Sequence, residues 1–238
     1  MSVKVVLFDL DGTLLPMDQD IFAKAYFKGL ATKLAPLGYD PDKLIKGIWT
    51  GTEAMIRNNG DKTNEEVFWD VFAGIFGPQV REDEPHFDEF YRTDFQKVKD
   101  VCGYAPQAAE VVHKLQEKGT RVVLATNPIF PAIATQSRIR WAGLQPEDFE
   151  LYTTYENSSF CKPNLEYYKA ILDCIGVPAE ECLMVGNDVG EDMITENLGM
   201  KVFLLTDCLI NKKDVDIAIY PNGGFDELMS YLSDLGLV

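Results

Sequence analysis

The chain has 238 residues, of which 46% are hydrophobic, and its 38 acidic and 22 basic residues give a net charge of −16. This length and apolar content suit one large domain or a core with an insertion, whereas the negative charge disfavours nucleic acid and anionic membranes as partners. No apolar run approaches 18 residues, and the first is four residues long and ends in Asp, so we expect neither a membrane span nor a signal peptide.

The five cysteines are an odd number and include no C-x-x-C pair. Disulfide frameworks and redox motifs usually show paired spacing. The cysteines therefore predict reduced thiols, mostly buried filler, in a cytoplasmic protein.

The most informative segment lies at the start of the chain. Residues 5–8 are an apolar run that predicts a buried strand, and Asp9, Asp11, Gly12 and Thr13 follow it. Side chains two residues apart on an extended chain point to the same side, so both carboxylates can reach one small volume. Two close carboxylates repel unless a cation neutralises them. The pair therefore predicts a metal site, an acid–base site or both.

Residues 16–95 show helical periodicity and no convincing strand. Apolar side chains share helical faces in four stretches, beginning near Phe22, Pro41, Asn64 and Phe87. An all-helical block between the first two strands cannot lie inside a sheet. We therefore predict a helical cap domain over residues 16–95, and a catalytic core formed by residues 1–15 and 96–238.

Strand and helix patterns alternate after about residue 104. Short apolar runs predict strands, and amphipathic stretches that begin at Pro or Asn and stop at Gly predict helices. The predicted strands cover 121–126, 151–155, 182–185 and 201–205, and the predicted helices cover 106–119, 131–142, 164–176 and 225–235. This alternation is typical of an α/β fold with a doubly wound parallel sheet.

Polar residues follow the predicted strands. Asp9 and Asp11 follow the first strand, Thr126-Asn127 end the second, and an acidic stretch over 187–192 follows the strand near 183. Lys162 precedes the helix that begins at Asn164. Ligands of open parallel sheets bind at the carboxyl ends of the strands, so we expect these groups on one rim.

Each of these groups has a use in phosphoryl transfer. Asp9 can attack phosphorus, and Asp11 can exchange a proton with the leaving oxygen and with water. Thr126 can hold phosphate oxygens, and Lys162 adds positive charge. Mg²⁺ prefers hard oxygen ligands, which Asp9, the Asp11 carbonyl and an acid from 187–192 would supply. Asn127 on the rim and Arg57 in the helical block are further candidates for substrate contact.

The chain resembles the haloacid dehalogenase superfamily of hydrolases. Asp9-Leu10-Asp11-Gly12-Thr13-Leu14 is similar to the family's first motif, and Thr126, Lys162-Pro163 and the 186–192 loop resemble its other three motifs, in order. The resemblance implies a Rossmann-like core with a helical cap. It also implies that Asp9 is the nucleophile, Asp11 the general acid and base, Thr126 a phosphate ligand, and Lys162 a group that orients both.

The fourth motif departs from the family pattern. It usually begins Gly-Asp, but Gly186 is followed here by Asn187. Either Asp188 and Asp192 form the acidic pair, or Asn187 replaces the first acid and Asp192 carries the charge. We favour Asp188 as a direct metal ligand and Asp192 as a ligand through water, with Asn187 as a possible neutral ligand.

Together these observations predict a monomeric, Mg²⁺-dependent phosphomonoester hydrolase that forms an aspartyl-phosphate on a small soluble phosphate ester. A phosphosugar mutase would use the same Asp pair. A haloacid dehalogenase would need neither the metal nor Asp11, so Asp11 disfavours it. A non-catalytic phospho-acceptor such as a receiver domain is half as long and lacks the helical insertion, which favours an enzyme.

Overall fold

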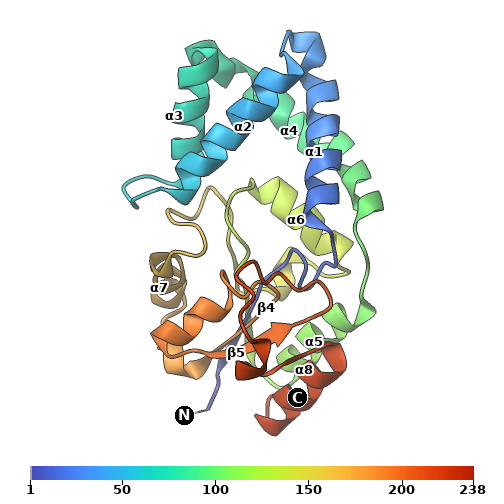
Figure 1. The fold of residues 1–238 in the computed structure, drawn as a ribbon, viewed down its shortest axis with the longest axis vertical. Helices are drawn as coiled ribbons and strands as arrows, with labels where there is room; N and C mark the ends of the chain where they lie inside the picture. The colour runs from blue at the N-terminus through green and yellow to red at the C-terminus, as the bar shows by residue number, and fades with distance from the viewer. Residues whose placement is uncertain (1) are drawn as a thin grey trace.

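The computed structural model describes residues 2–238 and shows the predicted alternation of strands and helices (Figure 1). The sheet half contains β1 (Val5–Phe8), β2 (Arg121–Leu124), β3 (Leu151–Tyr152), β4 (Cys182–Gly186), β5 (Lys201–Leu205) and β6 (Asn222–Gly223), with α5 (Pro106–Glu117), α6 (Ala132–Trp141), α7 (Leu165–Ile175) and α8 (Phe225–Asp234). The segment between β1 and β2 contains α1 (Gln19–Leu34), α2 (Pro41–Ile56), α3 (Asn64–Phe76) and α4 (Glu84–Arg92).

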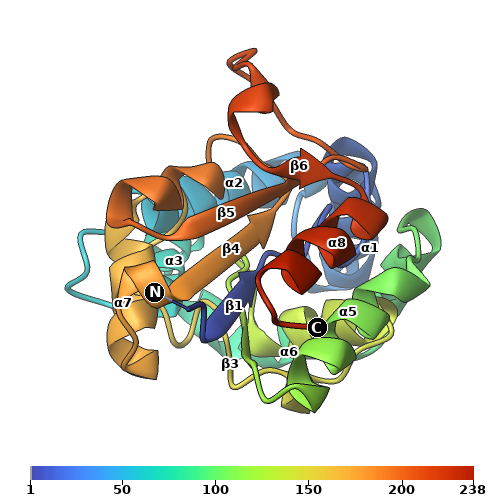
Figure 2. The same cartoon turned by 90° about the horizontal axis from the view of Figure 1, so that it is seen from below.

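The six strands form one sheet in the order β3-β2-β1-β4-β5-β6, and every neighbouring pair is parallel. β1 lies in the middle, and its residues alternate between two hydrophobic clusters. Val6 and Phe8 belong to the cluster that includes α5 and α8, whereas Val5 and Leu7 belong to the cluster that includes α7. Helices therefore cover both faces of the sheet (Figure 2), which confirms the predicted doubly wound fold.

Two strands differ from the sequence predictions. β3 spans two residues rather than 151–155. The Thr153 N–H still donates to the Leu124 carbonyl oxygen at 3.1 Å and its hydroxyl donates to the Thr126 carbonyl oxygen at 2.6 Å, but the chain turns at 155–157. β6, at Asn222–Gly223, was not predicted, because a two-residue strand carries no apolar run from which it could be recognised.

The helical segment lies over the carboxyl ends of the strands (Figure 1). Asp18, Asp40 and Thr63 accept hydrogen bonds from backbone N–H groups at the starts of α1, α2 and α3, which explains where these helices begin. Phe72 and Phe90 are fully buried in its aromatic interior. Among residues 2–238, no helix has both the length and the apolar character of a membrane span.

The helical segment begins and ends at neighbouring points of the chain. Met17 forms an antiparallel bridge with Cys102, and the Gly103 N–H donates to the Pro16 carbonyl oxygen at 2.7 Å. A 3₁₀ helix at Asp94–Val101 crosses the predicted boundary at residue 95, so helical structure continues about as far as this bridge. The division into two domains stays a prediction.

The aromatic interior of the helical segment should contribute strongly to stability. Phe72 is fully buried and stacks or packs edge-on against Phe68, Trp69, Phe76 and Phe87. We expect Phe72→Ala to lower the free energy of unfolding by about 3–5 kcal/mol, measured by urea denaturation. Leu37→Ala, at a residue 40% exposed, should change it by less than about 0.5 kcal/mol. Equal effects of the two substitutions would contradict this account of the interior.

Candidate active site

The register of the sheet brings three loops together. Phe8, the last residue of β1, pairs with Leu124 of β2 and Val185 of β4. The residues that follow these strands therefore leave the sheet at one level, and they include Asp9, Thr126 and Asn187. This is the rim that the sequence predicted.

A buried lysine lies between two carboxylates on this rim. Lys162 Nζ donates to Asp9 Oδ1 at 2.8 Å and to Asp192 Oδ1 at 2.7 Å, and all three residues are buried. Burial alone would lower the pKa of Lys162, but Asp192 and Asp9 outweigh it and hold that pKa well above its usual range. Burial raises the pKa of Asp192. The ammonium group is therefore fixed as a charge shared by both acids.

The other oxygen of Asp9 lies beside the acidic loop. The Thr13 hydroxyl lies 3.0 Å from both Asp9 Oδ2 and Asn187 Oδ1, so these two acceptor oxygens approach each other. The Asn187 amide donates to the Cys208 carbonyl oxygen at 2.6 Å. A Cβ at Gly12, where φ is +86°, would overlap the Asn187 amide, so glycine is required there by both backbone and space.

The two aspartates of the loop make different contacts. Asp192 Oδ2 accepts from the Asp188 N–H at 3.0 Å, so both oxygens of Asp192 are occupied. Asp188 Oδ1 accepts from the N–H groups of Gly190 and Glu191 at 2.7 and 3.1 Å, and Asp188 lines the cavity described below.

Asp11 pairs with an arginine that the sequence reading missed. Arg138 of α6 is fully buried, and its guanidinium forms an ion pair with Asp11 Oδ2 while it lies 4.5 Å from the centroid of the Phe130 ring. Burial raises the pKa of Asp11, and the charge of Arg138 opposes that rise. In sequence Arg138 is one of two arginines in a helix, next to the exposed Arg140, and nothing in the pattern distinguishes them.

The remaining predicted residues divide between the rim and the surface. Thr126 is buried and lines the cavity, and Asn127 beside it donates to Glu191 Oε2 at 3.3 Å. The structure does not bring Arg57 to the site, because its side chain is 80% exposed and lies 3.8 Å from Glu53 on the same helix.

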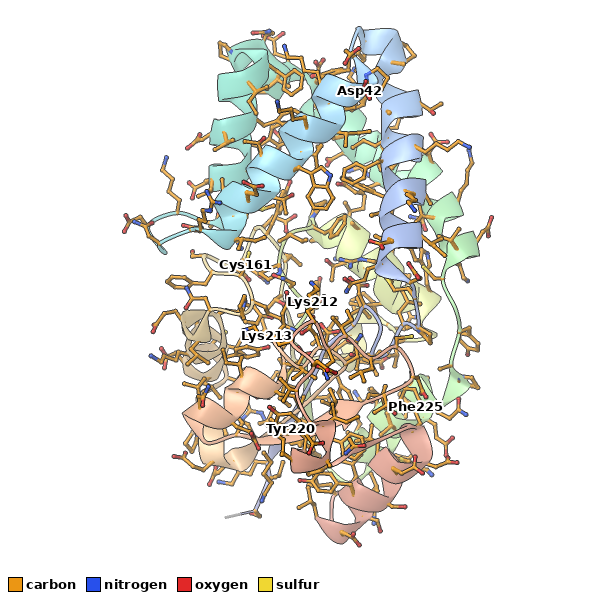
Figure 3. All side chains as sticks on the ribbon, viewed as in Figure 1. Asp42, Cys161, Lys212, Lys213, Tyr220 and Phe225 are labelled. Carbon is orange, nitrogen blue, oxygen red and sulfur yellow. The ribbon has the colours of Figure 1, made fainter. Side chains whose placement is uncertain are left out.

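A cavity of about 380 Å³ opens above the rim. Asp9, Asp11, Thr126 and residues of the 187–192 loop line its floor, and aromatic side chains of the helical segment line its walls. Cys161, next to Lys162, marks the level at which the helical segment faces the sheet half (Figure 3). Asn64 of α3 connects the two halves there by donating to the Pro128 carbonyl oxygen at 3.2 Å.

The floor of the cavity fits a divalent cation in charge and donor chemistry. Asp9, Asp11, Asp188, Glu191 and Asp192 bring five carboxylates to it, whereas only Lys162 and Arg138 contact these acids as cations. Asp11 Oδ1 and Asn127 Oδ1 are buried without a hydrogen-bond partner. Within residues 2–238, no three His, Cys, Asp or Glu side chains surround one point, so a cation would also need carbonyl, amide or water oxygens, which Mg²⁺ accepts.

The Arg138–Asp11 pair generates a stability prediction. Arg138→Met keeps the apolar stem but removes the guanidinium, and it leaves the Asp11 carboxylate without its charged donor. We expect the free energy of unfolding to fall by about 1.5–3 kcal/mol in urea denaturation. Arg140→Met removes an exposed arginine from the same helix and should have little effect. Equal stability of the two variants would show that the ion pair contributes nothing.

Comparisons with known proteins agree with this geometry. Residues 3–195 match the family model of the haloacid dehalogenase-like hydrolases. A phosphoglycolate phosphatase of Caulobacter vibrioides is 22% identical over 202 residues, which are 84% of this chain and 78% of that protein.

Solved structures show the same fold over nearly the whole chain. A 2-haloacid dehalogenase of Pseudomonas syringae has a TM-score of 0.63 and 19% identity, with 98% of this chain and 99% of that chain covered. A HAD-hydrolase of Bacillus subtilis, bound to magnesium, has a TM-score of 0.55 and 17% identity, with 98% and 99% covered. Because the family model spans most of the chain, the protein belongs to the haloacid dehalogenase-like hydrolases.

Proposed function

We propose that the protein is a Mg²⁺-dependent phosphomonoester hydrolase that acts through an aspartyl-phosphate on Asp9. The observation that chiefly supports this proposal is the buried Lys162, which contacts Asp9 at 2.8 Å. It holds one carboxylate oxygen of Asp9 in place and adds positive charge where a phosphate dianion would sit. The phosphatase named among the relatives is consistent with this activity.

The residues on the rim can carry both steps of the reaction. In the first step a carboxylate oxygen of Asp9 attacks phosphorus, the bond from phosphorus to the ester oxygen breaks, and the Asp11 carboxyl gives its proton to that oxygen. In the second step the Asp11 carboxylate takes a proton from water as the water oxygen attacks phosphorus, which releases phosphate and restores Asp9. The raised pKa of Asp11 favours the protonated form that the first step needs.

Asp9, the Asp11 carbonyl oxygen and the 187–192 loop would hold the magnesium ion. Bound there, it would neutralise the charge that otherwise repels a phosphate dianion. Within the loop, Asp188 remains our first choice as direct ligand, because both oxygens of Asp192 already accept hydrogen bonds. Asn187 stays the alternative, because its Oδ1 shares the Thr13 hydroxyl with Asp9.

Removal of the nucleophile is the first test. Asp9→Asn should lower turnover of p-nitrophenyl phosphate on the order of 10⁴-fold and leave the circular dichroism spectrum unchanged. Asp226→Asn, at an exposed acid of α8, should retain activity. Turnover by Asp9→Asn at the rate of the unmodified enzyme would contradict the nucleophile assignment.

The intermediate can be observed directly. Asp11→Asn lacks the base for the second step, whereas an aryl leaving group needs little help from an acid in the first. We therefore expect acid-quenched Asp11→Asn to carry one phosphoryl group on the peptide that contains Asp9, seen by mass spectrometry. Slow turnover without this species would favour direct attack by water.

Metal removal is a separate test with its own readout. Chelation should abolish turnover, and Mg²⁺ at about 100 times its dissociation constant should raise the melting temperature of the metal-free protein by about 5–10 °C. Asp188→Asn should weaken this shift if Asp188 is the direct ligand. If Asn187 is the ligand, Asn187→Ala should weaken it more. No shift in the unmodified protein would argue against a resident metal.

A further inference from the structure

The walls of the cavity differ chemically from its floor. Ten aromatic residues line it, and most come from the four helices that lie over the sheet. Their rings pack against one another, as Tyr26 does edge-on against Phe130 at 5.4 Å and Phe27 against Trp49 at 5.4 Å between centroids. This packing fixes the walls as an apolar surface above the acidic floor.

No cationic side chain of residues 2–238 lines the cavity. Seven of its lining residues are Asp or Glu, and none is Lys, Arg or His. On the helical side the charged residues are Asp20 and Asp88, and Asp88 lies 3.4 Å from the exposed Arg92. The two buried cations nearby, Lys162 and Arg138, already pair with carboxylates.

Lys212 and Lys213 are not wall residues, but the charge of Lys212 opposes the rise that burial causes in the pKa of Glu191 on the floor. Both are exposed on the loop that follows β5, on the sheet side of the molecule (Figure 3). Neither lines the cavity.

Besides Asp20 and Asp88, the walls carry neutral polar groups, which include the hydroxyls of Tyr26, Tyr91 and Thr52. Tyr26 and Tyr91 hydrogen-bond each other at 3.0 Å, and Thr52 donates to the Ile48 carbonyl oxygen at 2.9 Å. Burial raises the pKa of Tyr26 to about 12, so this hydroxyl stays protonated at neutral pH. An anionic leaving group placed among these walls would be removed from water without a counter-charge, which is costly.

Part of the mouth of the cavity is apolar, whereas the exposed Gln19 and Asp20 of α1 also line the cavity. Trp49 and Ile56 of α2 both line the cavity, yet they are 50% and 45% exposed. Exposed large apolar side chains at the opening of a cavity are typical of a binding surface for an apolar ligand.

We propose that the substrate is a phosphate monoester whose leaving group is apolar or aromatic and carries no negative charge. This inference rests on the proposed phosphatase activity. It also separates this chain from an enzyme whose substrate ends in a carboxylate, because none of the residues that line this cavity would give a carboxylate a counter-charge.

Three alkyl phosphates of similar intrinsic reactivity test the proposal. With Mg²⁺ present, we expect kcat/KM for benzyl phosphate to exceed that for phosphoglycolate on the order of 100-fold, with glycerol 3-phosphate between them. A preference for phosphoglycolate over benzyl phosphate would overturn the inference and leave the phosphatase proposal intact.

Two variants at the mouth test whether the walls determine substrate preference. Both residues are partly exposed, so we expect the fold to tolerate their substitution. Trp49→Ala should lower kcat/KM for benzyl phosphate about tenfold and that for methyl phosphate by less. Ile56→Lys should raise relative activity on phosphoglycolate. Ile21→Ala, at a residue that is 50% exposed but does not line the cavity, should change neither. Unchanged selectivity in both mouth variants would overturn the assignment of these walls.

A binding measurement distinguishes failure of the leaving-group inference from failure of the phosphatase proposal. Asp9→Asn with Mg²⁺ should bind benzyl phosphate more tightly than phosphoglycolate in calorimetry. Tighter binding of phosphoglycolate would overturn the inference. Absence of turnover on every ester by the unmodified enzyme, with benzyl phosphate still preferred in binding, would count against the phosphatase activity alone.

Discussion

A single buried ammonium shared by two carboxylates is the constraint around which the rest of the site is arranged. Lys162 comes from the loop before α7, whereas Asp9 and Asp192 come from loops after β1 and β4, so this contact joins three parts of the chain that are far apart in sequence. The single positive charge of Lys162 cannot neutralise both Asp9 and Asp192, and Asp11 is a third carboxylate nearby. The excess of negative charge favours the binding of a cation or a hydrogen-bond donor. The contact of Lys162 with Asp9 and Asp192 therefore holds three parts of the chain together and also favours ligand binding.

The groups around Lys162 contact the acids individually and do not neutralise all of their negative charge. Arg138 holds Asp11 from the side, and the Thr13 hydroxyl lies between Asp9 and Asn187. Asn187 is neutral and directly precedes Asp188, so the first acid of the family motif is either supplied by Asp188 or replaced by Asn187. The loop therefore presents both a neutral and a charged oxygen donor next to the nucleophile, at Asn187 and Asp188.

The sequence predicted those features that are governed by strand register and short motifs. Asp9, Asp11, Thr126 and Lys162 were found because each follows or precedes a recognisable buried element, and parallel strands bring such positions to one edge. Arg138 was missed because its ion pair with Asp11 depends on how α6 packs over the site, and the helical periodicity of the sequence does not predict this packing. Arg57 was placed near the substrate from its location in the helical segment alone, and in the structure its side chain is exposed beside Glu53. The two-residue β6 had no pattern to be recognised by.

The bridge between Met17 and Cys102 has a consequence for how such a protein could change over time. Since the chain leaves the sheet half and returns to it at adjacent points, the ends of the inserted segment are already held together by the Gly103–Pro16 hydrogen bond. The segment can be lengthened, shortened or exchanged with little additional loop-closure entropy, because that entropy depends on the separation of its ends and only weakly on its length. The segment that we propose to select the leaving group is thus the part whose replacement disturbs the groups on the rim least.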